Sequence, residues 1–295
     1  MAQQRRAFGR GGAGDLIVRK GLGRGWHDAY HWLLATSWPR FIGLLVAGYA
    51  VANLVFAIGY TLEPGAIANA HQGSFGDIFF FSVHTLATIG YGNMYPQTLY
   101  ANVLVAMEAT VGVLALPLVT GLVFAKFARP TARVLFSDRA IIAPRDGQLS
   151  LFLRMANGRR NQIVEAHARL SVVRLETTQE GEPIRRIHDL PLVRSETGVF
   201  VFTWIITHPI TPSSPLYGAT PASLDADQAE FVVSIVGIDE TSSQTIHARW
   251  SYLPAEIVWG GRFVDVLTDL DDGRRQIDYA RFHDVVSDPR ESPRP

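Results

Sequence analysis

The residues with the clearest chemical potential in this 295-residue chain are Thr88, Ile89, Gly90, Tyr91 and Gly92. A backbone whose carbonyl oxygens all point at one axis can replace the water around a potassium ion. Alternate glycines permit such a backbone, because Gly90 and Gly92 can take angles that are closed to other residues. Tyr91 would point outward and brace the loop from behind, and the Thr88 hydroxyl would add one more oxygen. The pentad therefore predicts a potassium-coordinating filter, with a plain glycine turn between two helices as the alternative.

An apolar segment on each side and a short helix must position this pentad. Residues 41–60 are almost wholly apolar, and about 20 such residues cross the hydrocarbon layer of a membrane. Residues 100–128 exceed that length, so this helix should tilt or extend beyond the layer. A helix capped by Ser74 is too short to cross, so it must be re-entrant and buried in protein. The predicted pore domain, residues 39–129, comprises an outer helix, a pore helix, the filter and an inner helix over 40–61, 74–86, 88–92 and 99–128.

The distribution of charge supports the same division. The net charge is zero, but no Lys or Arg occurs between Arg40 and Lys126, whereas basic residues occur on both flanks. Cationic flanks around such a block predict that both termini lie in the cytoplasm. The chain has no cysteine, which excludes disulfides and thiol catalysis. We expect no cleavable signal peptide, because no apolar core precedes Trp26.

The N-terminal residues predict membrane-surface structure. Residues 1–25 favour a flexible basic tail. Residues 26–38 place aromatic side chains at helical spacing, which is typical of an amphipathic helix that lies on a membrane surface. Pro39 should end that helix. The alternative is a surface helix packed on a soluble core.

Three features inside the apolar block require partners or bends. Asn53 should bond to a neighbouring helix. Glu108 is costly in a membrane helix and should face an interior. Its nearest partner in sequence is His84, just before the filter, so one hypothesis is a buried His84–Glu108 contact and the other is contact of Glu108 with pore water. The inner helix can bend at three positions, Gly112, Pro117 and Gly121.

Residues 130–295 have a different pattern, with short β-branched or alternating runs separated by glycine-containing turns. The runs cover residues 149–155, 168–175, 199–206, 231–236 and 245–252. Many short strands of this kind predict a β-sandwich rather than an α/β enzyme fold. The sequence has no phosphate loop, metal-ligand spacing or nucleophile–base set, and its basic residues are scattered. We therefore expect neither an enzyme nor a nucleic-acid-binding protein.

Together these features resemble the bacterial inward-rectifier potassium channels, from Trp26 to Val286. The filter pentad fits any potassium channel, and the resemblance becomes specific in the second half of the chain. It rests there on His188-Asp189-Leu190, Trp204, His208-Pro209-Ile210, Ser214-Pro215-Leu216-Tyr217, Tyr252-Leu253-Pro254-Ala255-Glu256-Ile257 and Trp259-Gly260-Gly261-Arg262-Phe263.

The resemblance implies a homotetramer in the bacterial inner membrane. Each chain would contribute two transmembrane helices and a re-entrant pore helix, followed by a cytoplasmic immunoglobulin-like β-sandwich that regulates the pore. The implied activity is passive, potassium-selective conduction with inward rectification and voltage-gated channel activity. No cofactor is expected beyond potassium ions bound by carbonyls of Thr88, Ile89, Gly90 and Tyr91.

The resemblance also implies roles for particular residues. Phe124 falls at a gate near the cytoplasmic end of the inner helix. Leu116 stands where strongly rectifying relatives carry an acidic residue that holds polyamine or divalent-cation blockers, and His84 stands where many relatives carry a pore-helix glutamate. Anionic lipid headgroups would meet Lys126, Arg129 and Arg133, with Arg19, Lys20 and Arg24 as additional contacts. A second, cytoplasmic constriction would be formed by residues 237–245, including Gly237, Thr241, Ser242, Ser243 and Gln244.

Two other functions are compatible with the sequence. One is a channel of the same fold with relaxed selectivity. The other is a membrane-anchored sensor whose β-domain carries the function above a vestigial pore, although the intact pentad argues against it.

Overall fold

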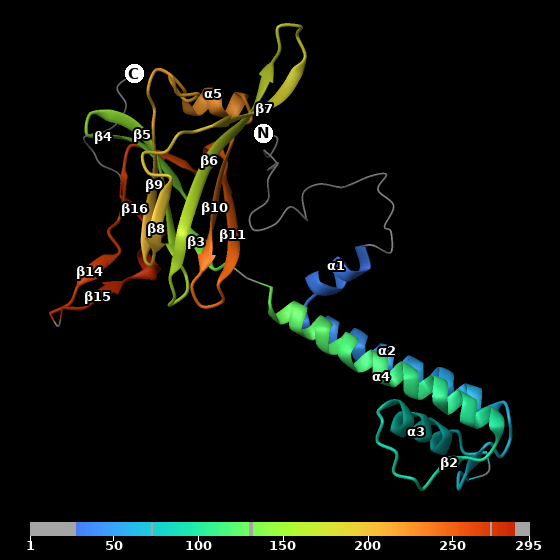
Figure 1. The fold of residues 1–295 in the computed structure, drawn as a ribbon. Helices are drawn as coiled ribbons and strands as arrows, with labels where there is room; N and C mark the ends of the chain where they lie inside the picture. The colour runs from blue at the N-terminus through green and yellow to red at the C-terminus, as the bar shows by residue number, and fades with distance from the viewer. Residues whose placement is uncertain (1–27, 72, 130–131, 272, 287–295) are drawn as a thin grey trace. The chain divides into compact units, whose positions relative to one another are not determined.

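The computed structural model describes residues 28–71, 73–129, 132–271 and 273–286. The chain divides into two compact units, a helical one that ends at Arg129 and a β-rich one that follows it (Figure 1). The predicted basic tail, with Arg19, Lys20 and Arg24, lies outside the described residues, as does the start of the predicted surface helix at Trp26.

Within its described residues the helical unit contains helices α1 to α4 and a two-residue strand pair. The helices are α1 (Asp28–Ala35), α2 (Trp38–Thr61), α3 (Phe75–Leu86) and α4 (Leu99–Phe127), and the strands are β1 (Ile67–Ala68) and β2 (Tyr95–Pro96). Pro39 does not end the surface helix as expected, because it lies in the first turn of α2. A missing N–H costs no hydrogen bond at that position.

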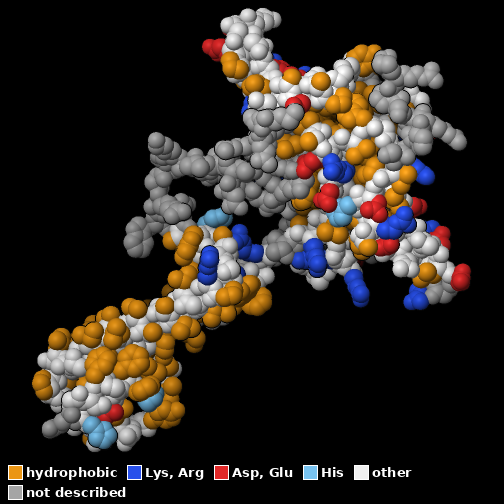
Figure 2. All heavy atoms as spheres, turned by 180° about the vertical axis from the view of Figure 1, so that it is seen from behind, with side chains coloured by type: hydrophobic (Ala, Val, Ile, Leu, Met, Phe, Trp, Pro, Cys, Tyr) orange, Lys and Arg blue, Asp and Glu red, His pale blue; other side chains and the backbone are white. Residues whose placement is uncertain are grey.

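Helices α2 and α4 are long and apolar enough to cross a membrane, with mean hydropathies of 2.2 and 2.0. Only 17 % and 11 % of their most apolar windows are buried within the single chain, which distinguishes them from core helices of a soluble protein. Figure 2 shows hydrophobic side chains over most of the visible surface of this unit. Such a surface requires lipid or further protein around it.

The β-rich unit is a sandwich of two five-stranded sheets. In one sheet the order is β11-β10-β6-β7, with β8 paired to β6, and in the other it is β12-β4-β5-β3, with β9 paired to β5. Side chains from both sheets form the main core, including Leu151 and Leu153 of β5 and Val233 and Ile235 of β10. The first sheet contains β6 (Ile163–Thr177), β7 (Pro183–Asp189), β8 (Glu196–Phe200), β10 (Glu230–Asp239) and β11 (Gln244–Tyr252). The second contains β3 (Val134–Phe136), β4 (Ala140–Arg145), β5 (Gln148–Asn157), β9 (Thr203–Pro209) and β12 (Ile257–Trp259).

The single strand predicted over residues 199–206 is wrong. Strand β8 ends at Phe200 and β9 begins at Thr203, and the two belong to different sheets. The apolar run continues across the break because both strands contribute side chains to the same core, including Phe200 and Trp204. Periodicity alone cannot show where the chain passes from one sheet to the other.

Short elements complete the sandwich, and a buried arginine secures the last of them. These elements are α5 (Pro221–Ala226), η1 (Pro254–Glu256), β13 (Arg262–Phe263), β14 (Leu267–Asp269), β15 (Arg275–Ile277), η2 (Tyr279–Arg281) and β16 (Val285–Val286). Arg154 of β5 is only 3 % exposed and donates hydrogen bonds to the backbone oxygens of Val264, at 2.5 Å, and Phe282. Its guanidinium also lies 4.6 Å from the centre of the Phe263 ring. The C-terminal segment is therefore held on the second sheet by backbone contacts as well as by apolar packing.

Candidate ion-conducting pore

The pore helix α3 is fixed at both ends. At its N-terminus the Ser74 hydroxyl accepts a hydrogen bond from the Asp77 amide at 3.2 Å, so the predicted cap is confirmed. At its C-terminus the amides of Ile89 and Gly90 donate to the carbonyl oxygen of His84, at 2.8 and 3.3 Å. The chain therefore folds back over the end of the helix, where the helix dipole carries partial negative charge.

The backbone of the pentad alternates in handedness. The angle φ is +55° at Thr88, +58° at Gly90 and +79° at Gly92, whereas it is not positive at Ile89 or Tyr91. Alternation of positive and negative φ directs successive backbone groups toward one side, unlike a regular strand. Glycine takes positive φ without strain, whereas a non-glycine residue such as Thr88 incurs a conformational cost there. The segment can therefore present a row of oxygens to one axis.

The ring of His84 packs against the ring of Tyr91 in the pentad. The two rings meet edge to face, with centroids 4.9 Å apart and an interplanar angle of 89°. They border a hollow of about 300 Å³ that Phe81, Thr85 and residues 92–94 also line. Tyr91 remains 74 % exposed in the single chain, so much of its surface is available to a neighbouring subunit.

Both hypotheses for Glu108 are wrong. Its carboxylate contacts the hydroxyls of Tyr60 and Ser82 rather than His84, and the Tyr60 hydroxyl donates to it at 2.6 Å. The side chain is fully buried, so it does not meet pore water. The expectation for Asn53 is confirmed, because its side-chain oxygen lies 3.2 Å from the Ser82 hydroxyl on α3. Sequence periodicity indicates that Glu108 faces inward but does not reveal which polar groups on the other helices it meets.

The three predicted bend points differ in their surroundings. Gly112 packs directly against the end of the pore helix, because a Cβ atom there would lie 2.2 Å from the Leu86 carbonyl oxygen. A Cβ atom at Gly121 would meet open space. Helix α4 continues through Pro117. Gly112 is therefore in close contact with the end of the pore helix, whereas the Cβ position of Gly121 has no neighbouring atom within 4 Å.

The remaining predicted pore and lipid residues of α4 and its continuation are exposed. Leu116 and Phe124 are 71 % and 72 % exposed, and their spacing places them on similar faces of the helix. Arg129 and Arg133 are also exposed. These side chains are free to meet partners outside the single chain.

The side chain of Lys126 makes its hydrogen bonds within the same chain, which contradicts its predicted contact with a lipid headgroup. It is 7 % exposed, and its Nζ atom donates to the backbone oxygens of Leu34 and Thr36, at 3.1 and 2.6 Å. The ammonium group also lies 5.3 Å and 4.8 Å from the ring centres of Trp38 and Phe41. The carbonyl end of α1 attracts a cation, so Lys126 acts as a cap supplied by the inner helix.

Residues 237–245, predicted to form a cytoplasmic constriction, are only partly a loop in the structure. Gly237 lies inside strand β10, where a Cβ atom would come within 2.6 Å of Ile163, and Gln244 begins strand β11. The exposed turn is thus formed by residues 240–243, including Thr241, Ser242 and Ser243.

Asp239 organises this turn by accepting hydrogen bonds from the amides of Thr241 and Ser242, at 3.0 and 3.1 Å. Burial of Asp239 opposes ionisation, but hydrogen bonds from the Asn161 side chain and from these two amides keep its pKa below its ordinary value. The carboxylate therefore stays ionised and holds the turn, with Arg159 at 3.3 Å.

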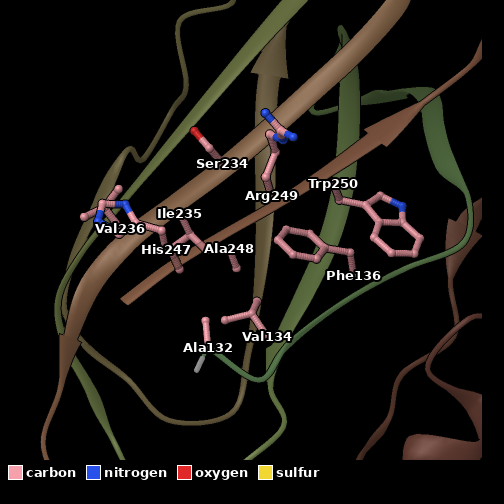
Figure 3. Close-up of a pocket in the computed structure, with 10 residues that line it drawn as sticks. All are labelled: Ala132, Val134, Phe136, Ser234, Ile235, Val236, His247, Ala248, Arg249 and Trp250. Atoms are coloured by element: carbon pink, nitrogen blue, oxygen red, sulfur yellow. The ribbon is translucent and has the colours of Figure 1, made fainter. Parts of the chain in front are cut away.

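A second hollow, of about 490 Å³, lies on the sandwich beside β3, β10 and β11 (Figure 3). Its floor includes Trp250 stacked on Phe136, with ring centroids 6.0 Å apart. None of the residues predicted from the sequence to form a site lines it. Its described lining contains His247 and Arg249 but no acidic residue, so it offers no acid–base pair.

Two family models match the chain. One, described as "Ion channel", matches residues 41–129, and the other, described as "Inward rectifier potassium channel C-terminal domain", matches residues 134–293. The second match alone spans 160 of the 295 residues. The chain belongs to the inward-rectifier potassium channel family. The channel thus carries the family's cytoplasmic domain after an ion-channel pore module, and it is not an enzyme.

Relatives of the channel occur in bacteria and animals. It is 48 % identical to the inward rectifier potassium channel Kirbac3.1 of Paramagnetospirillum magnetotacticum, over 92 % of each chain. It is 38 % identical to the inward rectifier potassium channel irk-1 of Caenorhabditis elegans, over 73 % of this chain and 42 % of the relative. It is also 38 % identical to the human inward rectifier potassium channel 18, over 86 % of this chain and 61 % of the relative.

Proposed function

We propose that four copies of this chain form a potassium-selective channel. The observation that carries the proposal is the alternating handedness of the backbone from Thr88 to Gly92. One chain supplies one strand of a filter that is built from four, so the carbonyl oxygens of Thr88, Ile89, Gly90 and Tyr91 would form stacked potassium sites along a shared axis. The exposed surfaces of Ile89 and Tyr91 in the single chain agree with such an assembly.

The proposed location is the bacterial inner membrane, with both termini in the cytoplasm. Helices α2 and α4 supply two crossings, and the stretch from residue 41 to residue 125 has no Lys or Arg. An even number of crossings with basic residues at both flanks supports a cytoplasmic position for both ends.

Potassium and sodium flux from liposomes that contain the purified tetramer tests the function. We expect potassium flux with little sodium flux. Similar flux of both ions would instead support a channel with relaxed selectivity. If the native tetramer and the Phe124→Ala tetramer both assemble but neither conducts, the result would support a membrane-anchored sensor.

The proposed gate is a ring of four Phe124 side chains. Such a ring forms an apolar constriction that stops ions by excluding water. Phe124→Ala should therefore raise basal potassium flux without changing the ratio of potassium to sodium flux. Phe127→Ala is the matched control, because Phe127 is equally exposed at 72 % on the same helix. Unchanged basal flux in a well-folded Phe124→Ala tetramer would move the gate elsewhere, with the turn at residues 240–243 as the next candidate.

Rectification should be weak in the native channel. Polyamine block requires acidic side chains in the cavity, where attraction between charges is stronger than in bulk water. Leu116 makes that position apolar, and Glu108 is buried among other helices. Leu116→Asp should add four cavity charges and give tighter block by internal spermine with steeper voltage dependence, since each charge moved through the field contributes about 2.3 kcal/mol per 100 mV. Current–voltage curves in planar bilayers measure this, and strong native block that vanishes in Glu108→Gln would refute it.

Anionic lipid should act through Arg129 and Arg133. Both are exposed, whereas Lys126 is engaged with α1, so lipid contact falls to the two arginines. Neutralising both removes roughly 1 kcal/mol of surface attraction per charge and should shrink the change of flux that added phosphoinositide produces. Neutralising Arg185 and Arg186, which are exposed on β7, is the matched control. If the Arg129/Arg133 variant responds fully to phosphoinositide, the two arginines only set the orientation of the chain in the membrane.

A further inference from the structure

Glu108 is the fully buried acid of the helical unit, and hydroxyl groups from two other helices surround its carboxyl group. Tyr60 of α2 donates to Oε2 at 2.6 Å, and the hydroxyl of Ser82 on α3 contacts Oε1. Tyr60 is 1 % exposed, and Ser82 and Glu108 are 0 % exposed. Three helices therefore meet at one carboxyl group that has no access to solvent in the single chain.

No lysine or arginine side chain from the pore segment is available to balance a charge at this site. The sequence contains no Lys or Arg from residue 41 to residue 125, and identical subunits bring none from the same stretch. The two histidines of this stretch are engaged elsewhere: His71 contacts Asp77 at 2.5 Å, and the ring of His84 packs on Tyr91. An ionised carboxylate at membrane depth without a cation is strongly disfavoured.

The titratable groups around Glu108 do not change this conclusion. On α2 the facing group is Tyr60, which is a hydrogen-bond donor here. On α3 the closest titratable residue in sequence to Ser82 is His84, whose ring turns to the filter. On α4 itself, Tyr100 directs its hydroxyl to the backbone oxygen of Gly59 at 3.0 Å.

A count of hydrogen atoms indicates the protonation state. The Ser82 oxygen contacts Glu108 and lies 3.2 Å from both the side-chain and the backbone oxygen of Asn53, yet a serine hydroxyl carries one hydrogen. If Glu108 were ionised, its oxygen and the side-chain oxygen of Asn53 would compete for that hydrogen, and one of these two buried acceptors would be left without a donor. If Glu108 is protonated, it donates to Ser82, Ser82 donates to Asn53, and the Asn53 amide donates to the Tyr49 backbone oxygen at 2.8 Å.

The hydrogen-bonded network around Glu108 also lies close in sequence to the predicted filter. Ser82 is two residues before His84, whose carbonyl oxygen accepts the amides of Ile89 and Gly90. Glu108 is one helical turn before Gly112, which touches the Leu86 carbonyl group. The network and the glycine contact therefore join the inner helix to the pore helix at two successive turns.

We propose that Glu108 is a protonated carboxylic acid and a positioning residue for the filter, which holds α3 against α4 and α2 through Ser82 and Tyr60. Loss of its proton at alkaline pH places an unbalanced charge between the helices, draws water into the contact and stops conduction. The effect on conduction rests on the proposed function, whereas the protonation state can be tested without any flux.

The first experiment is infrared difference spectroscopy of the full-length tetramer. The C=O stretch of a protonated carboxylic acid should be present in the native protein at neutral pH and absent in Glu108→Gln. Ser82→Ala should retain this band at a shifted frequency, because the acid loses the hydroxyl that accepts its proton. Glu182→Gln, at an exposed position in the sandwich, should leave the band unchanged. Identical native and Glu108→Gln spectra in the carboxylic acid region would overturn the proposal.

The second experiment measures potassium flux against pH. Native flux should fall at alkaline pH, by at least about tenfold for each pH unit once most copies of Glu108 have lost the proton, since every channel holds four copies. Glu108→Gln should conduct and lose this dependence, because its neutral amide can donate to Ser82 and accept from Tyr60. An alkaline loss of the same size in Glu108→Gln would refute the conduction step while leaving the spectroscopic result to decide protonation. Absence of flux at every pH in both proteins, with the infrared band present, would count against the proposed channel function alone.

Discussion

A Gly90→Ala channel should lose selective potassium flux while it still assembles. The angle φ at Gly90 is +58°, and no atom lies within 4 Å of a Cβ built there in the single chain. The cost of the substitution is therefore conformational, at roughly 1–2 kcal/mol for a left-handed residue, and it recurs in each of the four chains. Relaxation of this strain would turn carbonyl oxygens away from the axis, because the row of oxygens depends on the alternation of φ.

A control for backbone strain alone is available at Gly65. This glycine has φ of +80° and open space around its Cβ position, and it lies in the exposed turn after α2. Gly65→Ala should carry the same conformational cost and leave the ratio of potassium to sodium flux unchanged. The measurement is flux of both ions from liposomes, with tetramer assembly followed by size. A Gly90→Ala tetramer that conducts and selects normally would remove the filter assignment.

Gly112→Ala should have the second large effect, on the assembly of the pore itself. A Cβ atom at this position would lie 2.2 Å from the Leu86 carbonyl oxygen and 3.1 Å from its carbon, both of which are backbone atoms. The two helices must separate, and overpacking of this kind typically costs about 1–3 kcal/mol at each site. We expect a lower melting temperature of the tetramer and a marked loss of potassium flux, because α4 can no longer support the end of α3.

Gly121→Ala is the matched substitution on the same helix. Its Cβ position is open, and alanine favours a helix over glycine by about 1 kcal/mol. The melting temperature should therefore stay the same or rise. Equal melting temperatures and fluxes for the native and Gly112→Ala proteins would show that α3 and α4 are not in contact at Leu86 in the working channel.

The sequence predicts the order of elements and the filter because both depend on local signals. The lengths of the two apolar segments, the Ser74 cap and the glycines at positions 90 and 92 each specify structure within a few residues. The short runs and glycine turns after residue 130 predict the sandwich, and the resemblance then adds the family. The start of α2 at Trp38 differs from prediction by two residues, since Pro39 can begin a helix as well as end one.

Contacts between elements could not be predicted in the same way. The partners of Glu108 depend on how three helices are rotated about their axes, and the sequence offered His84 only because it is near the filter. The family resemblance implied a lipid contact for Lys126, but its ammonium group donates to the carbonyl end of α1 instead. The break between β8 and β9 was hidden because strands in different sheets contribute to one core.

The capping of α1 by Lys126 has a mechanical consequence. The lysine is two residues beyond Phe124, and its ammonium group holds the backbone oxygens of Leu34 and Thr36 at 3.1 and 2.6 Å. Helix α1 and the C-terminal end of α4 therefore cannot move independently without breaking the charge-assisted contact between them. A lateral pull on α1 would therefore be passed to the end of α4 that carries Phe124, the proposed gate, through the lysine beside the rings of Trp38 and Phe41.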